Sequence, residues 1–178
     1  MRVNIKNSSG FALIDLIFVC GMIGLISSIA VPRLLLARQS ASSASAIGTM
    51  RAVNSAELSF AISCGSGFYA PSLTTLGTPP MGTTEPFISP DVGAADSVTK
   101  SNYLIQLTAQ GFVGAPPSCN GLGADTAGRG YRAGADALEP GNLRYFGTNA
   151  SATIFEDVNS LFATMPEFDD PPSGHILH

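Results

Sequence analysis

The stretch FALIDLIFVCGMIGLISSIAVP, residues 11–32, decides the fold, because its 22 residues contain a single charged side chain, Asp15. A helix of that length spans roughly 33 Å, which is enough to cross the hydrocarbon core of a bilayer. A cleaved secretory signal has a shorter apolar run followed by a small-residue cleavage site, so this class is disfavoured. A plain transmembrane anchor accounts for the length without further assumptions.

The acid within this run is its unusual feature. A carboxylate costs about 2.5–3.5 kcal/mol at the centre of a bilayer and less near the interface, so such residues usually have a partner or a function. Asp15 lies only four residues after the run begins. We therefore expect it to have a role beyond anchoring.

Charge is divided unevenly along the chain. The first 51 residues carry five Lys and Arg against one Asp, a balance of +4, and the remainder carries four against twelve acids, a balance of −8. Binding to nucleic-acid phosphates needs clustered Lys and Arg, so the distal part is not expected to bind nucleic acid. Basic residues flank the apolar run on both sides, and charge alone does not decide its orientation in a membrane.

Residues 33–63 contain no Pro and are rich in Ala, Ser and Leu, which predicts that the helix continues as an amphipathic segment. Two apolar lines follow helical spacing. One comprises Ile47, Met50, Leu58 and Ile62, interrupted by Asn54, and is expected to face a sheet; the other comprises Ala46, Val53, Ala56 and Phe60. Two lines suit contacts with the chain's own domain and with neighbouring subunits, and a single broad buried face is the alternative.

The distal region, residues 64–164, has the composition of a loop-rich β domain. Residues 64–101 are rich in Gly, Pro, Ser and Thr, and strand patterns follow at 103–108, 130–135, 143–148 and 152–156, the last two joined as a hairpin through residues 149–151. A long helix followed by an antiparallel sheet predicts an α+β fold with the helix across one sheet face. Residues 165–178 are acidic and Pro-rich, which predicts a flexible tail.

Three cysteines suggest one disulfide. Cys20 lies within the apolar run and is interpreted as a packing residue, so Cys64 and Cys119 are the plausible pair. Two unrelated buried thiols are the alternative. A disulfide would imply an oxidising compartment and would place the distal domain outside the cytoplasm.

The inventory of reactive residues does not favour an enzyme. Both His residues, His175 and His178, lie in the predicted tail, and no phosphate-binding Gly-rich loop or zinc-ligand spacing is present. The acids at 156, 157, 169 and 170 fit no calcium-loop template and are interpreted as solvated charges. We expect no catalytic residue, no metal site and no cofactor.

The N-terminal pattern resembles the cleavage and methylation motif of type IV prepilins. A short basic, polar leader ends at Gly10; Phe11 and an acid at the fifth position after the Gly follow in register, with Gly24 and Pro32 further along. The continuation at 31–73, with its Ala- and Ser-rich helix and YAPSL turn, is also similar to bacterial pilins. The resemblance extends over residues 8–76.

The resemblance implies a processing and assembly scheme. Residues 1–10 would be a leader that a prepilin peptidase removes after Gly10, with methylation of the new amine of Phe11. Residues 11–32 would be the transmembrane and filament-core helix, and Asp15 would pair with the amine of a neighbouring subunit. The segment between Gly24 and Pro32 would kink or melt locally, although glycines there also permit close helix packing.

The expected function is therefore a structural subunit of a type IV pilus-like filament. The precursor would lie in the bacterial inner membrane with its N terminus in the cytoplasm, and the filament would be extracellular. Expected partners are other copies of the chain, the prepilin peptidase and the pilus assembly machinery. A pseudopilin of a type II secretion system is the main alternative, and a monomeric membrane-anchored periplasmic protein is a further one.

Overall fold

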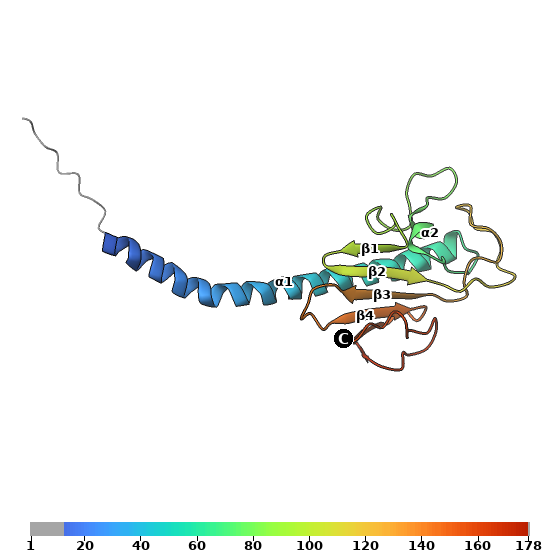
Figure 1. Cartoon of the computed structure of the whole chain (residues 1–178). Coiled ribbons are helices and arrows are strands. Elements are labelled where there is room, and N and C mark those ends of the chain that lie inside the picture. Colours follow the sequence, from blue (N-terminus) through green and yellow to red (C-terminus); the bar gives the residue numbers. More distant parts are fainter. Residues whose placement is uncertain (1–12, 178) are drawn as a thin grey trace, which may run out of the picture. The chain divides into compact units, whose positions relative to one another are not determined.

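The computed structural model describes residues 13–177 and contains two helices and six strands within them (Figure 1). Their bounds are α1 Leu13–Ser63, α2 Leu73–Gly77, β1 Ser97–Lys100, β2 Tyr103–Thr108, β3 Arg132–Ala137, β4 Tyr145–Asn149, β5 Ile154–Asp157 and β6 His175–Ile176. The predicted α+β class is confirmed, because the C-terminal part of α1 packs on a six-stranded antiparallel sheet. This arrangement of helix and sheet is pilin-like.

The chain divides into two units, of which the first ends at Ser40 and the second begins at Ala41. In the first unit, residues 13–40 are helical and those from 13 to 38 are all exposed. Pro32 lies inside α1. A Pro in a helix removes one backbone donor, and the helix nevertheless continues on both sides of this residue.

In the second unit, the strands form a meander in the order β1-β2-β3-β4-β5-β6, every neighbouring pair antiparallel. Residues in β2 alternate between buried and half-buried positions, as expected for a strand with one face on a core. The cross-strand row Ile105, Ala135 and Phe146 lies on the buried face. The C-terminal part of α1 packs on this face.

The helix buries one face, and this face corrects one sequence prediction. Met50 is buried as expected and Ile47 is half-buried, but Leu58 and Ile62 are 55% and 76% exposed. The second apolar line covers the sheet instead: Ala46, Val53, Ala56 and Phe60 are all at most 3% exposed. Positions 46, 50, 53, 57, 60 and 64 follow three- and four-residue steps along one stripe, and Leu58 and Ile62 lie outside it.

Two polar side chains fix the helix over the sheet. Near the start of the second unit, the hydroxyl groups of Ser43 and Tyr103 are 2.9 Å apart, and Tyr103 also donates to the carbonyl of Arg144 at 3.1 Å. Further along, Asn54 accepts a hydrogen bond from Tyr131 at 2.9 Å and donates to the carbonyl of Ala152 at 3.0 Å. Asn54, the residue that interrupts the apolar line, therefore joins α1 to the residue just before β3 and to the β4–β5 turn.

The strand predictions are confirmed in number and order for β2 to β5. The predicted range 103–108 coincides with β2, whereas β3, β4 and β5 each begin two residues later than predicted. The sequence analysis missed β1, α2 and β6. The β1–β2 turn consists of Ser101 and Asn102, both with positive φ, a two-residue turn that suits a hairpin.

The C-terminal segment differs from the flexible tail expected from its composition. Met165 is buried with Phe155 and Leu161 in a small second core. His175 and Ile176 form β6 and pair with β5. Residues 161–176 therefore contribute to the sheet and to its second face.

This second face has room for the segment because two glycines face each other across β3 and β4. Gly134 and Gly147 are register partners, and Phe155 is the partner of Gly147 on the next strand. A Cβ atom at Gly134 would lie 2.7 Å from the Cβ of Phe162, and one at Gly147 would lie 2.4 Å from the Cε of Met165. The glycines let the segment approach the sheet closely.

Replacing Gly134 with Ala is therefore expected to destabilise the domain by about 1–3 kcal/mol, the usual cost of overpacking. The nearest atoms, the Cβ and Cα of Phe162, belong to the backbone end of the residue and cannot rotate away. Urea unfolding of the full chain in detergent, followed by near-UV circular dichroism, measures the change. Gly123→Ala is the matched control, because a Cβ there meets no atom within 4 Å; equal midpoints for the two variants would contradict the packing account.

Candidate processing and assembly site

The candidate assembly segment is the apolar part of α1, from Leu13 to Leu36 in the described residues. By length and composition α1 can cross a membrane, a test that signal sequences and core helices of soluble proteins also pass. None of the apolar stretch is buried, which distinguishes it from a core helix. Side chains such as Leu13, Ile14 and Leu25 are more than 70% exposed. Such a surface is stable only in lipid or against another protein.

Asp15 lies in the first turn of α1 and is exposed. A carboxylate at this position interacts favourably with the positive end of the helix dipole. The predicted cleavage residue Gly10 and the predicted methylated residue Phe11 lie outside the described residues. Their roles stay predictions, as does the pairing of Asp15 with the amine of a neighbouring chain.

The glycines of the assembly segment have open surroundings. A Cβ at Gly21 or Gly24 would meet no atom of the chain within 4 Å. The free Cys20 is exposed next to them. The helix is regular through Gly24, so both predicted roles of this residue, compliance and close packing, stay open predictions.

The predicted pair Cys64 and Cys119 forms a disulfide. Cys64 immediately follows α1, and the bond joins it to the long loop between β2 and β3. The backbone supports the same contact, since the N–H of Cys119 donates to the carbonyl of Cys64 at 3.3 Å. The apolar helix and this disulfide indicate a membrane-anchored or secreted protein.

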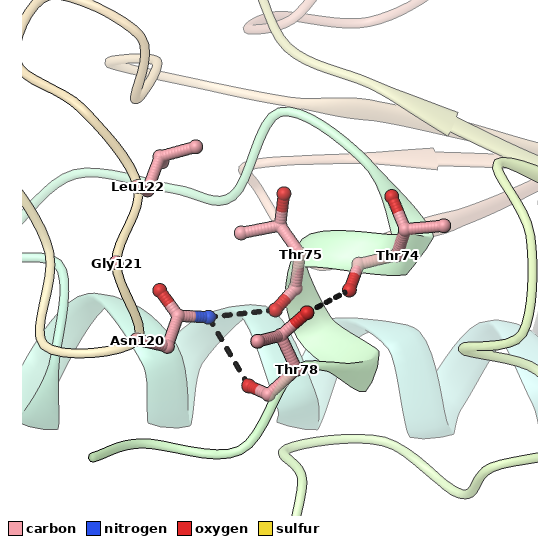
Figure 2. Close-up of a pocket in the computed structure, with 6 residues that line it drawn as sticks. All are labelled: Thr74, Thr75, Thr78, Asn120, Gly121 and Leu122. Atoms are coloured by element: carbon pink, nitrogen blue, oxygen red, sulfur yellow. Dashed lines mark hydrogen bonds between the residues drawn. The ribbon is translucent and has the colours of Figure 1, made fainter.

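Next to the disulfide lies a shallow pocket of about 200 Å³ (Figure 2). Asn120 projects toward α2 and its amide donates to the carbonyls of Thr75 at 2.7 Å and Thr78 at 3.2 Å. Thr78 in turn donates its hydroxyl to the carbonyl of Thr74 at 2.8 Å. These polar groups bond to one another, so the pocket lies where hydrogen bonds connect the disulfide loop to α2.

Reactive groups do not converge elsewhere in the described residues. Within residues 13–177 no group of three or more His, Cys, Asp and Glu side chains is placed to hold a metal ion. Glu156 forms a bidentate ion pair with Arg144, at 2.5 and 2.9 Å, which lowers the pKa of its carboxyl. His175 lies in β6 beside this pair, and His178 is outside the described residues.

One buried acid was missed by the sequence analysis. Glu57 is fully buried in the face of α1 that covers the sheet. One carboxyl oxygen, Oε2, accepts a hydrogen bond from the N–H of Ala70 at 2.8 Å, and Oε1 has no hydrogen-bond partner among the described residues. Burial raises the pKa of Glu57 from 4.5 to about 8, against a smaller lowering by the Ala70 N–H.

A signal for this acid was present in the sequence. Glu57 occupies the same helical stripe as Met50, Val53 and Phe60, where an apolar residue would be expected. Its carboxyl binds the backbone segment between α1 and α2, so the acid has a structural role in the fold.

Comparisons of the chain with protein-family models, with curated proteins and with solved structures find no match.

Proposed function

We propose that the chain is a structural subunit of a type IV pilus-like filament, processed after Gly10 and assembled through α1. The observation that carries the proposal is the exposed apolar segment of α1 with one carboxylate in its first turn. The same helix continues beyond this segment, and its C-terminal part packs on the β domain that contains the disulfide. A plain membrane anchor would also need an apolar segment of this length, but it would not account for Asp15.

The physical argument concerns where the apolar segment is buried. In the precursor, lipid covers it; in the filament, the same segments of neighbouring copies replace the lipid. Cleavage after Gly10 creates a cationic amine at Phe11, and an unpaired charge of either sign in an apolar core is costly. Asp15 of a neighbouring copy would neutralise that amine. The family usually has Glu at this position, and Asp reaches one methylene less far.

The proposal includes no catalysis by this chain. Its partners would be other copies of itself, the prepilin peptidase, the inner membrane before assembly and the pilus assembly machinery. The filament would be extracellular.

Mass spectrometry of the terminal peptide tests processing. The expected mature chain begins at N-methylated Phe11, and a chain that keeps Met1 would contradict the proposal. Electron microscopy of material sheared from cells then distinguishes two classes of subunit. Abundant fibres containing the chain support a pilin, whereas a processed chain that forms no fibres favours a secretion pseudopilin.

Replacing Asp15 with Ala is expected to leave cleavage intact and to lower the yield of fibres by at least about tenfold, because breaking a buried ion pair costs about 3–5 kcal/mol. Asp15→Glu should retain fibres, since it keeps the charge. Glu85→Ala, which removes an exposed acid of the distal domain, is the matched control. Quantifying sheared fibres by immunoblot measures the effect, and a normal yield for Asp15→Ala would rule out charge pairing.

A further inference from the structure

The C-terminal strand β6 lies at the edge of the sheet and is attached to it through β5. Its two residues are exposed and pair in register with two residues of β5. On one side of this pairing, the N–H of Leu177 donates to the carbonyl of Ile154 at 2.9 Å. On the other side, Ser173 donates a hydrogen bond to the carboxylate of Asp157. Residues 173–177 therefore form one segment that is bound along the whole length of β5.

The chain is held a second time just before this segment. The side-chain amide of Asn149 donates to the carbonyl of Pro166 at 3.1 Å and to that of Asp169 at 2.7 Å. Residues 170–172, with the sequence Asp-Pro-Pro, connect Asp169 to the segment that contains β6. The β6 segment is thus joined to the body of the domain by a short hinge.

The hinge is stiff, and its turns are unfavourable for most residues. Proline fixes its own φ and restricts the residue before it to extended conformations, so residues 170–172 run extended. The chain turns back to the sheet through left-handed residues on either side, with φ of 66° at Asp169 and 91° at Gly174. A left-handed conformation is unfavourable for a residue other than Gly, although Asp adopts it more readily than most. Folding β6 back onto its own β5 therefore has a conformational cost at Asp169.

We propose that β6 is exchanged between copies of this chain in the assembled filament, so that residues 173–177 of one copy pair with β5 of the next. Both copies have the same sequence, so the exchanged segment makes the contacts that it makes within one chain, and the hinge alone changes. Exchange therefore needs no new complementary surface or charge. Each copy donates its segment to the next and receives one from the copy before, an open arrangement that suits a filament.

The seat on β5 identifies the occupant as this same segment. Ile154 is buried in the main core, and Leu177 packs against that core. The positive charge of His175 lowers the pKa of the carboxyls of Glu156 and Asp157. An edge strand that loses its partner exposes unpaired backbone N–H and C=O groups. The departure of β6 is therefore unfavourable unless an identical segment of a second copy takes its place.

The packing of α1 decides between the closed and the exchanged position of β6. Copies dispersed in detergent meet rarely, so β6 closes on its own β5. Copies held side by side by α1 are present to one another at an effective concentration in the millimolar range, which makes exchange favourable. The extended residues 170–172 span roughly 10 Å, so the receiving β5 must lie next to the donating hinge. This inference rests on the proposed filament function, which brings the copies together.

Disulfide trapping of one register pair tests the exchange. Glu156 and His175 are register partners, and the Cα atoms of such partners lie about 4.5–5.5 Å apart, within the range that a disulfide bridges. In a Cys20→Ser background, Glu156→Cys and His175→Cys are placed on separate, differently tagged copies and co-expressed, so that a bond between these positions must join two chains. Oxidised fibres are expected to give a mixed dimer with this bond, at least about tenfold more than chains oxidised in detergent.

The same two substitutions in one chain give a second measurement. Closed β6 produces a monomer with an internal disulfide, whereas exchange produces a ladder of covalent oligomers in fibres. The matched control carries Thr99→Cys and Leu104→Cys, register partners on β1 and β2, which are joined by a two-residue turn. This pair should form an internal disulfide and no ladder in the same fibres.

The outcomes separate this inference from the proposed function. An internal disulfide without a ladder in fibres, or an equal ladder from the control pair, would overturn the exchange and leave the filament function standing. Neither an internal disulfide nor a ladder from the β5–β6 pair would overturn the exchange as well, because β6 would then not pair with β5. A chain that is neither cleaved after Gly10 nor present in fibres would contradict both proposals.

Discussion

Replacing Glu57 with Gln is expected to remove most of the pH dependence of domain stability between about pH 5 and pH 8. In the folded chain burial raises the pKa of Glu57 from 4.5 to about 8, so the carboxyl is protonated in the fold below that pH. In the unfolded chain it ionises near 4.5. Its full stability contribution is therefore present below about pH 4.5, is lost progressively as the pH rises, and is gone above about 8.

The size of the effect follows from the shift. At about 1.4 kcal/mol per pKa unit, the rise from 4.5 to about 8 corresponds to about 5 kcal/mol of stability lost across this range. The amide side chain of the Glu57→Gln variant would accept the same hydrogen bond from the Ala70 N–H without titrating. Burial also raises the pKa of Asp136, so a smaller dependence of the same sign should remain in Glu57→Gln.

Urea midpoints of the full chain in detergent at pH 5, 7 and 9 measure this dependence, with near-UV circular dichroism of the four tyrosines as the signal. Glu85→Gln is the matched control, because Glu85 is exposed. Its midpoints should follow those of the unsubstituted chain. A Glu57→Gln chain that loses as much stability between pH 5 and pH 9 as the control would show that another group titrates.

The long helix and the central strands were predictable because their signals are local. The run at residues 11–32 and the Pro-free segment after it define α1, whose C-terminal end at Ser63 agrees with the sequence prediction. The alternating pattern of β2 likewise gave its bounds. Both predictions depend on a hydrophobic period that repeats along the segment, so one atypical residue does not change the predicted element.

The face of α1 that meets the sheet was harder to predict because both candidate lines are apolar. Large side chains such as Leu58 and Ile62 favoured the wrong line, whereas the sheet selects the line that contains Ala46 and Ala56. Small residues there let the helix approach closely, and Phe60 fills the space near its end. Helical spacing identifies a stripe but does not specify which of two stripes the sheet covers.

The elements missed were those that depend on tertiary contacts. β6 has two residues, in a stretch whose composition resembles a tail, and it exists because β5 offers an edge for pairing. The buried position of Glu57 depends on the Ala70 N–H, 13 residues away. By contrast, the pairing of Cys64 with Cys119 was predictable, because the third cysteine lies in the apolar run.

Replacing Cys64 and Cys119 together with Ser is expected to destabilise the domain by about 4 kcal/mol. The two residues are 55 positions apart in the chain, and the chain-entropy model assigns roughly that stabilisation to a loop of this length. The loop contains α2, β1 and β2, so its release gives the unfolded chain additional freedom. Urea unfolding at pH 6, which keeps Glu57 protonated in the fold, measures the loss without interference from that acid.

Cys20→Ser is the matched control for this change, because Cys20 is a free thiol outside the loop. It should leave the urea midpoint of the domain unchanged, and a reductant should lower the midpoint of the control and not that of the double variant. The bond joins the end of α1 to the β2–β3 loop. Its loss therefore removes a covalent link between the helix and the sheet, whereas the strand pairing from β2 to β5 stays. A double variant as stable as the control would mean that the contact of Asn120 with α2 alone holds the loop in place.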